Sequence, residues 1–379
     1  MMMITVLVCY ERISLYHTMI PFFLRNYEGK NPIFHFTQSA EWCLKKDRNS
    51  ILFMERWFQH RQPQDLEDTD FELLKKLRDK YKTIVFFCGQ PEAGNNRMDI
   101  LPYIDKLYYK SIFADRDNYC KKLYGKTLFS DFYHTHYDIN DDFVYINKAD
   151  ITQQDAEKPE LSWNIGLGTY PRYHWPQRFG TALARANMPG IGKLIGGKSL
   201  KRAKLPGYLH SKPPKDFSSN SRSISVHARI KPVTCPSIAY QRVHFLNCIS
   251  ALAAEKQRLF VTGRVAQNKY YKELEDSKIV LSPFGWGEVC FRDFESILAG
   301  ALLFKPDMSH LITWPNVYIP YQTYIPLKWD GSDLLEQAER YLDDEQERKR
   351  IAMNAMEQYR SEMACLSQRI DIIMNSLRL

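Results

Sequence analysis

The sequence predicts an α/β protein built of two Rossmann-like domains, and three features of the chain support this fold class. Short apolar runs alternate with longer amphipathic stretches, which is the pattern of parallel strands covered by helices on both faces of a sheet. A segment rich in Gly, Pro, Ser and Lys, from about residue 186 to 222, interrupts this alternation, which then resumes. The length of 379 residues suits two domains of ordinary size.

The expected elements follow in chain order. The first half has apolar runs that we expect to be strands at 4–10, 31–37, 51–58, 83–89 and 106–114. Apolar residues at helical spacing predict a helix between the third and fourth of these, at 70–82. The second half has expected strands at 223–230, 258–265, 278–284 and 301–306. Its expected helices lie at 237–255 and 291–300, and the charged tail from 334 to 379 is almost continuously helical in pattern.

These elements divide the chain into four parts. They are a first domain over 1–190, a basic linker rich in Gly, Pro and Ser over 191–222, a second domain over 223–335 and a helical C-terminal segment over 336–379.

Composition narrows the class of protein. With 44% hydrophobic and 25% charged residues, the chain has the composition of a soluble globular protein. Its net charge of +8 favours anionic partners such as nucleotides, nucleic acid or an acidic membrane surface.

The apolar N-terminus lacks a basic region and a cleavage site, so we expect a strand there rather than a signal peptide. No run reaches the roughly 18 to 20 apolar residues of a membrane span. The eight cysteines form no C-x-x-C pair and are expected to be reduced thiols in a cytosolic protein.

The segment 192–199, GKLIGGKS, matches the pattern of a phosphate-binding loop of nucleotide triphosphatases. Such a loop works where a buried strand enters it and a helix leaves it. The preceding residues have no strand pattern, and no apolar run ending in Asp follows to hold Mg²⁺. We therefore expect a solvated basic linker, with contact to an anionic lipid or a phosphate-bearing acceptor as the less favoured alternative.

The segment 278–306, KIVLSPFGWGEVCFRDFESILAGALLFKP, contains the strongest functional signal. A buried strand is expected to open into a loop that contains Gly285 and Gly287 and then to enter a helix. The glycines allow close approach of a ligand to the backbone, and the helix N-terminus attracts an anion. Arg292 suits a phosphate, and Glu295 on the same helical face suits the paired hydroxyls of a ribose. The pattern predicts a nucleoside diphosphate site at the carboxyl end of a parallel strand.

The spacing Arg292-x-x-Glu295-x-x-x-x-Gly300, followed by LLF, resembles the donor-binding segment of GT-B glycosyltransferases, in particular the exostosin-like and family-1-like branch. The resemblance covers roughly residues 223–360. It implies two domains that face a cleft, an acceptor bound by the first, a nucleotide sugar bound by the second, and a long C-terminal helix packed across both. It also assigns Glu295 to the ribose.

The resemblance is less close at two positions. Glu288 and Glu295 are seven apart, whereas the paired glutamates of the family are eight apart, and Leu302 replaces the usual proline. We expect Glu288 to contact the sugar or its phosphates. Arg229 and Arg264 each follow an expected strand, where this fold binds ligands, so they are further candidates for phosphate binding; exposed loop arginines are the alternative.

Paired carboxylates suggest a rival within the transferases. Asp68-Thr-Asp70 and Asp115-Arg-Asp117 are D-x-D triplets, and the second follows an apolar run, as the Mn²⁺-binding pair of a GT-A enzyme does. The second Rossmann-like half argues against a GT-A enzyme, and Asp115 is equally suited to cap a helix.

A second candidate metal site is weaker. His134 and His136 alternate on a segment that we expect to be extended, beside acidic residues at 138, 141 and 142, and a plain surface is favoured over a metal site.

The general base is left open by the sequence. An inverting enzyme needs one from the first domain, where His17, Glu92, Asp115 and Asp117 are candidates, whereas a retaining enzyme needs none. We expect the charge of the leaving nucleotide to be stabilised by the helix N-terminus and by arginines rather than by a metal, with no cofactor.

The sequence thus predicts a hexosyl- or related glycosyltransferase that moves a sugar from a nucleotide-sugar donor to a hydroxyl of a glycan or lipid-linked acceptor. The resemblance to the family implies a role in the synthesis of cell-surface polysaccharide or lipopolysaccharide. The expected location is the cytoplasm or the inner face of the cell membrane, in contact with anionic lipid and without nucleic acid as a partner. The alternatives are a nucleotide hydrolase built on GKLIGGKS and a basic protein that binds nucleic acid or membranes.

Overall fold

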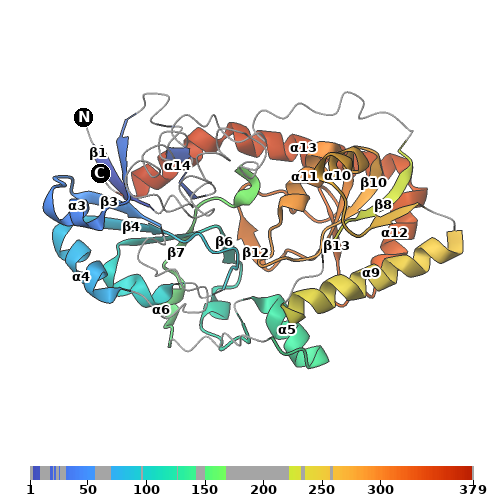
Figure 1. Cartoon of the computed structure of the whole chain (residues 1–379), viewed down its shortest axis with the longest axis horizontal. Helices are drawn as coiled ribbons and strands as arrows, with labels where there is room; N and C mark the ends of the chain where they lie inside the picture. The colour runs from blue at the N-terminus through green and yellow to red at the C-terminus, as the bar shows by residue number, and fades with distance from the viewer. Residues whose placement is uncertain are drawn as a thin grey trace.

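Two parallel sheets lie side by side in the computed structural model, which confirms the predicted α/β fold with two Rossmann-like domains (Figure 1). The structure describes residues 3–8, 18, 19, 21, 22, 25, 31–55, 70–94, 97–125, 127–141, 150–167, 222–231, 235–256 and 259–377. The segment GKLIGGKS and nearly all of the expected linker lie outside these residues, as do His17, Asp68 and Asp142.

The first sheet has the strand order β2-β1-β3-β4-β5-β7, with all neighbours parallel. Its strands are β1 (Met3–Leu7), β2 (Ile33–Thr37), β3 (Ile51–Met54), β4 (Thr83–Phe87), β5 (Lys106–Tyr109) and β7 (Pro159–Leu161). Helices α3 (Ala40–Lys45) and α4 (Phe71–Lys80) pack beside it. Helix α4 begins where predicted, because the Asp70 side chain accepts a hydrogen bond from the backbone N–H of Leu73 at 2.9 Å.

The second sheet has the order β13-β11-β10-β8-β9, again all parallel. Its strands are β8 (Ile224–Ala228), β9 (Phe260–Thr262), β10 (Ser277–Leu281), β11 (Leu302–Pro306) and β13 (Ile325–Leu327). Its helices are α9 (Pro236–Lys256), α10 (Gln267–Glu275) and α11 (Phe291–Ala299). Every residue of β8 and β11 is buried, as expected of strands covered on both faces.

Both sheets follow the same doubly wound order, in which the second strand pairs with the first and the third strand lies on the first strand's other side. The strand order reverses at this point, because the second and third strands lie on opposite sides of the first. In such a sheet the loops after the first and third strands diverge and leave a crevice at their carboxyl ends. In the second sheet this crevice lies after β8 and β10.

One expected strand is divided between the domains. Residues 106–114 form β5 and then a separate strand, β6 (Ser111–Phe113), which pairs antiparallel with β12 (Leu311–Thr313). The prediction of a single strand was wrong here, because β6 leaves the first sheet to join a partner from the second half of the chain.

The C-terminal segment is helical, as predicted, but is divided into α12 (Leu334–Asp343), α13 (Glu345–Ala364) and α14 (Leu366–Ser376). Helix α13 packs on α11 and β11, and the chain then passes back toward the first sheet, as Figure 1 shows. There Ser376 lies 2.8 Å from the Tyr108 hydroxyl, and Asp371 forms an ion pair with Arg25. None of the helices among the described residues is long and apolar enough to cross a membrane.

Side chains from the first domain hold the start of α9. Helix α5 (Leu128–Tyr137) precedes Asp141, whose carboxylate accepts hydrogen bonds from the N–H of Ser237 at 2.7 Å and from its hydroxyl at 2.9 Å. Further along α9, the buried side chain of Gln241 donates to the Tyr133 hydroxyl and accepts from the N–H of Phe284, both at 2.7 Å. Gln241 therefore joins α5 to the loop that follows β10.

Candidate functional site

The β10–α11 loop (residues 282–290) leaves the crevice between β8 and β10 and ends at the N-terminus of α11. The helix begins and ends where predicted: Asp293 accepts a hydrogen bond from the N–H of Cys290 at 2.9 Å, and Gly300 closes the helix with a left-handed φ of 69°. The loop follows the carboxyl end of a parallel strand and leads into a helix, as expected, and nucleotide binding there stays a prediction.

A buried polar network fixes the loop to the sheet. Asp293 forms an ion pair with Lys305 of β11, and neither side chain is exposed. The Tyr318 hydroxyl donates to the same carboxylate at 2.7 Å, and the Ser282 hydroxyl donates to it as well. Because all of these partners lie inside the domain, Asp293 holds the loop rather than a ligand.

Two arginines lie along the loop. Arg292 donates from Nε to the Ser282 hydroxyl and from Nη2 to the Pro283 carbonyl, both at 3.2 Å. Arg242 of α9 donates to the Phe284 carbonyl at 3.2 Å. Burial lowers the pKa of Arg242, and the charge of nearby Arg292 lowers it further. Two like charges are thus held close together beside a helix N-terminus, where the potential favours an anion.

Glu295 lies inside the domain and is 8% exposed. Its carboxylate accepts hydrogen bonds from the hydroxyls of Tyr270 at 2.8 Å and Tyr271 at 3.0 Å, both on α10. Arg292 and Glu295 therefore bond to different elements instead of to each other. A carboxylate has about four lone-pair sites, so Glu295 can accept further hydroxyls in addition to the two tyrosines.

The two domains meet at a contact that we call the domain junction: Pro91–Ala93 on one side, and Gly287 and Glu288 on the other. A Cβ atom on Gly287 would lie 2.0 Å from the Pro91 carbonyl oxygen, so only glycine allows this approach. Pro91 follows β4 and Gly287 follows β10. The carboxyl ends of the two sheets therefore face each other, as the resemblance to GT-B enzymes implied.

Glu288 is fully buried at the junction. Burial raises its pKa to about 8, and the neighbouring Glu92 adds to the rise. The amides of Glu288 and Ala93 and the Lys305 ammonium oppose it, although neither carboxyl oxygen has a hydrogen-bond partner of good geometry in the described part of the chain. At neutral pH the Glu288 carboxyl group therefore favours its protonated form. Glu288 is one of the residues that the sequence nominated.

The other two candidate phosphate ligands follow β8 and β9 of the second sheet. Arg229 follows β8 as predicted, but its guanidinium forms two hydrogen bonds with Glu273, at 2.8 and 2.7 Å. Arg264 is exposed just beyond β9. Phosphate binding by either arginine stays a prediction.

The candidate metal sites have structural roles. Asp115 caps a short 3₁₀ helix, Arg116–Tyr119, by accepting from the N–H of Asp117 at 3.1 Å, so the capping interpretation is confirmed. The prediction that His134 and His136 lie on an extended segment was wrong, because both lie on α5. Residues two apart on a helix face different directions, and among the described residues no group of three or more His, Cys, Asp or Glu could hold a metal ion.

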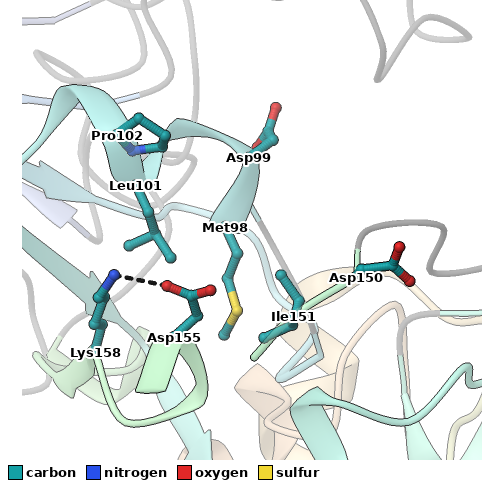
Figure 2. A pocket seen from close by; sticks show the side chains of 8 residues that line it. All are labelled: Met98, Asp99, Leu101, Pro102, Asp150, Ile151, Asp155 and Lys158. Atoms are coloured by element: carbon teal, nitrogen blue, oxygen red, sulfur yellow. Dashed lines mark hydrogen bonds and ion pairs between the residues drawn. The ribbon is translucent and has the colours of Figure 1, made fainter. Parts of the chain in front are cut away.

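A pocket of about 330 Å³ lies elsewhere in the first domain. Figure 2 shows its walls, formed by Met98, Asp99, Leu101, Pro102, Asp150, Ile151, Asp155 and Lys158. These segments precede β5 and β7, so the pocket lies at the amino ends of these strands, whereas the junction lies at the carboxyl ends. It contains none of the candidate residues.

Residues 239–375, which run from α9 to α14 and include the β10–α11 loop, match a protein-family model described as glycosyl transferase-like. This part of the chain is glycosyltransferase-like. The match confirms here the resemblance that was based on the spacing of Arg292, Glu295 and Gly300.

Several solved structures resemble the whole chain, all at low sequence identity. An alpha-glucosyltransferase (AGT) in complex with UDP is 12% identical over 99% of this chain and 100% of its own, with a TM-score of 0.44. A glycosyltransferase from Rickettsia africae ESF-5 is 11% identical over 99% and 98%, with a TM-score of 0.46. A UDP-forming alpha,alpha-trehalose-phosphate synthase from Burkholderia xenovorans, in complex with glucose-6-phosphate, is 14% identical over 90% and 75%, with a TM-score of 0.41. No curated protein matches the sequence.

The sequence did not nominate several residues that lie around the β10–α11 loop. Lys305 gave a usable signal, since a lysine inside the apolar run ALLFKP needs a buried partner. Arg242 and the two tyrosines of α10 gave none, because ordinary helical surface positions have the same pattern. Only the fold brings them to the loop.

Proposed function

We propose that this chain is a GT-B glycosyltransferase that transfers a sugar from a nucleotide-sugar donor to an acceptor hydroxyl. The observation that carries the proposal is the position of the β10–α11 loop. It leaves the switch point of a doubly wound sheet, ends at a helix N-terminus beside two arginines and faces the carboxyl end of a second sheet.

In this proposal the donor binds to the second domain. The N–H groups at the start of α11 and the Arg292 guanidinium bind the diphosphate and stabilise its charge as the nucleotide leaves, without a metal ion. Glu295 accepts hydrogen bonds from the ribose hydroxyls, and its two tyrosine partners hold the carboxylate in place. Gly285 lets the loop backbone approach the donor, whereas Gly287 lets the loop approach Pro91 of the first domain, and Glu288 lies near the sugar.

The acceptor binds to the first domain, with its hydroxyl near the junction. We propose a glycan or lipid-linked acceptor in cell-surface polysaccharide synthesis. A net charge of +8 is consistent with contact between the enzyme and an anionic membrane surface. Among the candidate bases, Glu92 lies at the junction, where its charge adds to the rise in the pKa of Glu288. A retaining reaction would need no such base.

The test is a screen of the full chain against UDP-, GDP-, ADP- and CMP-linked sugars, read as a shift in melting temperature and as nucleotide release, with and without EDTA. We expect one donor to stabilise the protein, and release to persist in EDTA. Oligosaccharides, lipid-linked sugars and duplex DNA serve as acceptors, since the basic charge makes DNA a necessary comparison. The absence of binding and release with every donor would refute the proposal.

A matched pair of variants tests whether the donor binds at the N-terminus of α11. Arg292→Ala should weaken donor affinity by about 10- to 100-fold, as expected for loss of a charge-assisted contact with a phosphate. Arg360→Ala removes an exposed arginine of α13 and should leave the affinity unchanged. Equal donor affinities in the two variants would show that the donor does not bind at the N-terminus of α11.

A further inference from the structure

Trp286 is the tip of the β10–α11 loop and is 60% exposed. Other described tryptophans are far less accessible, such as Trp163 at 0% and Trp314 at 9%. An indole in this position leaves a large apolar face in water, which is unfavourable by roughly 25 cal/mol per Å². A single exposed apolar side chain is common on a protein surface, so the observation that matters is the position of this one, on the loop that ends at the N-terminus of α11.

The backbone on either side of Trp286 is tightly held. The N–H of Gly285 donates to the Gly287 carbonyl at 3.0 Å, which closes a tight turn around the tryptophan. Gly287 packs against the Pro91 carbonyl of the first domain, and Gly285 lies beside Cys290 and Arg242. Residues of both domains therefore contact the base of the turn, and the Trp286 indole lies at the edge of the domain junction.

The surroundings of the indole favour a sugar over an apolar partner. Glycines flank Trp286, so its immediate neighbours in the chain add no apolar side chain to this surface. The turn is polar at its base, where the partly buried Arg242 guanidinium lies beside Gly285. A pyranose ring has one face of C–H groups that packs on a flat aromatic surface, and a rim of hydroxyls that pair with polar neighbours.

We propose that Trp286 is a stacking platform for a pyranose ring of a substrate and determines sugar specificity at the junction. The proposal deepens the proposed transferase function and rests on it for the identity of the ring, which belongs to either the donor sugar or the acceptor. The indole packs on the C–H face of the ring and takes no part in bond making or breaking.

Kinetics assign the ring to one substrate. Trp286→Ala should raise KM about tenfold for the substrate whose ring stacks there, because loss of an aromatic contact of about 1.4 kcal/mol corresponds to that factor. KM for the other substrate should be unchanged. Trp286→Phe keeps a flat ring and should restore most of the affinity. Phe71→Ala, at an exposed aromatic of α4, is the control and should change neither KM.

Intrinsic fluorescence gives a readout that does not depend on turnover. The wild-type emission should change on addition of UDP-glucose or of free oligosaccharides, and Trp286→Phe should lose this change. An equal change with UDP alone would assign the ring to the nucleobase and overturn the proposal.

The two proposals fail in different ways. The stacking platform would be overturned, and the transferase left intact, if the wild type turned over substrate and Trp286→Ala had the same KM values and the same sugar affinity as the wild type. Fluorescence that reports sugar binding at Trp286 without turnover of any donor would keep the platform and remove the transferase. The absence of both signals overturns both.

Discussion

Lys305 and Asp293 form an ion pair wholly inside the second domain, with 3.0 Å between Lys305 Nζ and Asp293 Oδ2 and neither side chain exposed. Asp293 also accepts from the N–H of Cys290, so the pair links β11 to the end of the β10–α11 loop. The position of α11, and with it the proposed donor site, therefore depends on a buried charge pair.

Breaking this pair should be costly. Lys305→Met leaves the Asp293 carboxylate buried without its counter-ion and should lower the free energy of unfolding by about 3–5 kcal/mol, whereas the double change Lys305→Met with Asp293→Leu should recover part of the loss. Urea denaturation followed by fluorescence measures this. Lys45→Met breaks the exposed pair with Glu41 and is the control, expected to leave the free energy of unfolding almost unchanged. Equal losses in the two single variants would contradict the argument.

The buried Glu288 predicts a particular pH dependence. Its pKa is raised from 4.5 to about 8, so the folded protein keeps the proton over a range in which the unfolded chain releases it. Stability should therefore fall as pH rises from 4.5 to about 8, by up to roughly 5 kcal/mol from this group, and level off above that.

Glu288→Gln keeps the shape but cannot ionise. Relative to the wild type, this variant should gain stability between pH 5 and pH 8, measured as the difference in urea midpoints at the two values. Glu41→Gln, at an exposed carboxylate of α3, should follow the wild type. A constant difference between wild type and Glu288→Gln across this range would show that Glu288 is ionised in the fold.

Gly287→Ala tests the domain junction. The new Cβ would lie 2.0 Å from the Pro91 carbonyl, so the two domains must separate locally, at a cost of about 1–3 kcal/mol. Gly285→Ala is a closely matched comparison, because the nearest atom would be Cys290 Sγ at 3.3 Å. We expect a lower melting temperature and a larger radius of gyration by small-angle X-ray scattering for Gly287→Ala than for Gly285→Ala. The reverse order would contradict the close contact.

The sequence predicted both sheets, because parallel strands buried on two faces appear as continuous apolar runs, of which β8 is a clear example. It missed β7, β12 and β13, which have three residues each and are too short for a periodic pattern. The turn of β6 away from its sheet depends on pairing with β12, which lies far along the chain and is not visible in the local sequence.

The same distinction applies to the site. The sequence placed Arg292, Glu295 and the loop glycines together because they lie in one continuous segment in which strand, loop and helix follow in order. Arg242 and Pro91 reach the loop from other elements, and only tertiary packing reveals them. The tyrosine partners of Glu295 come from α10, whose polar surface pattern gives no indication of a buried carboxylate beside it.

Gln241→Leu tests whether the contact between α5 and α9 positions the β10–α11 loop. The buried amide holds the N–H of Phe284 and the Tyr133 hydroxyl, both at 2.7 Å, and leucine of similar volume leaves that N–H without its partner. We expect a loss of about 1–3 kcal/mol in the free energy of unfolding. We also expect weaker donor binding, because the loop that begins at Ser282 is no longer fixed.

The control for Gln241→Leu is Tyr133→Phe, which keeps the hydrogen bond between Gln241 and Phe284 and should leave donor affinity close to that of the wild type. Equally weakened donor binding in both variants would contradict this prediction. The loop would then depend on the whole contact between α5 and α9 rather than on the single hydrogen bond to Phe284.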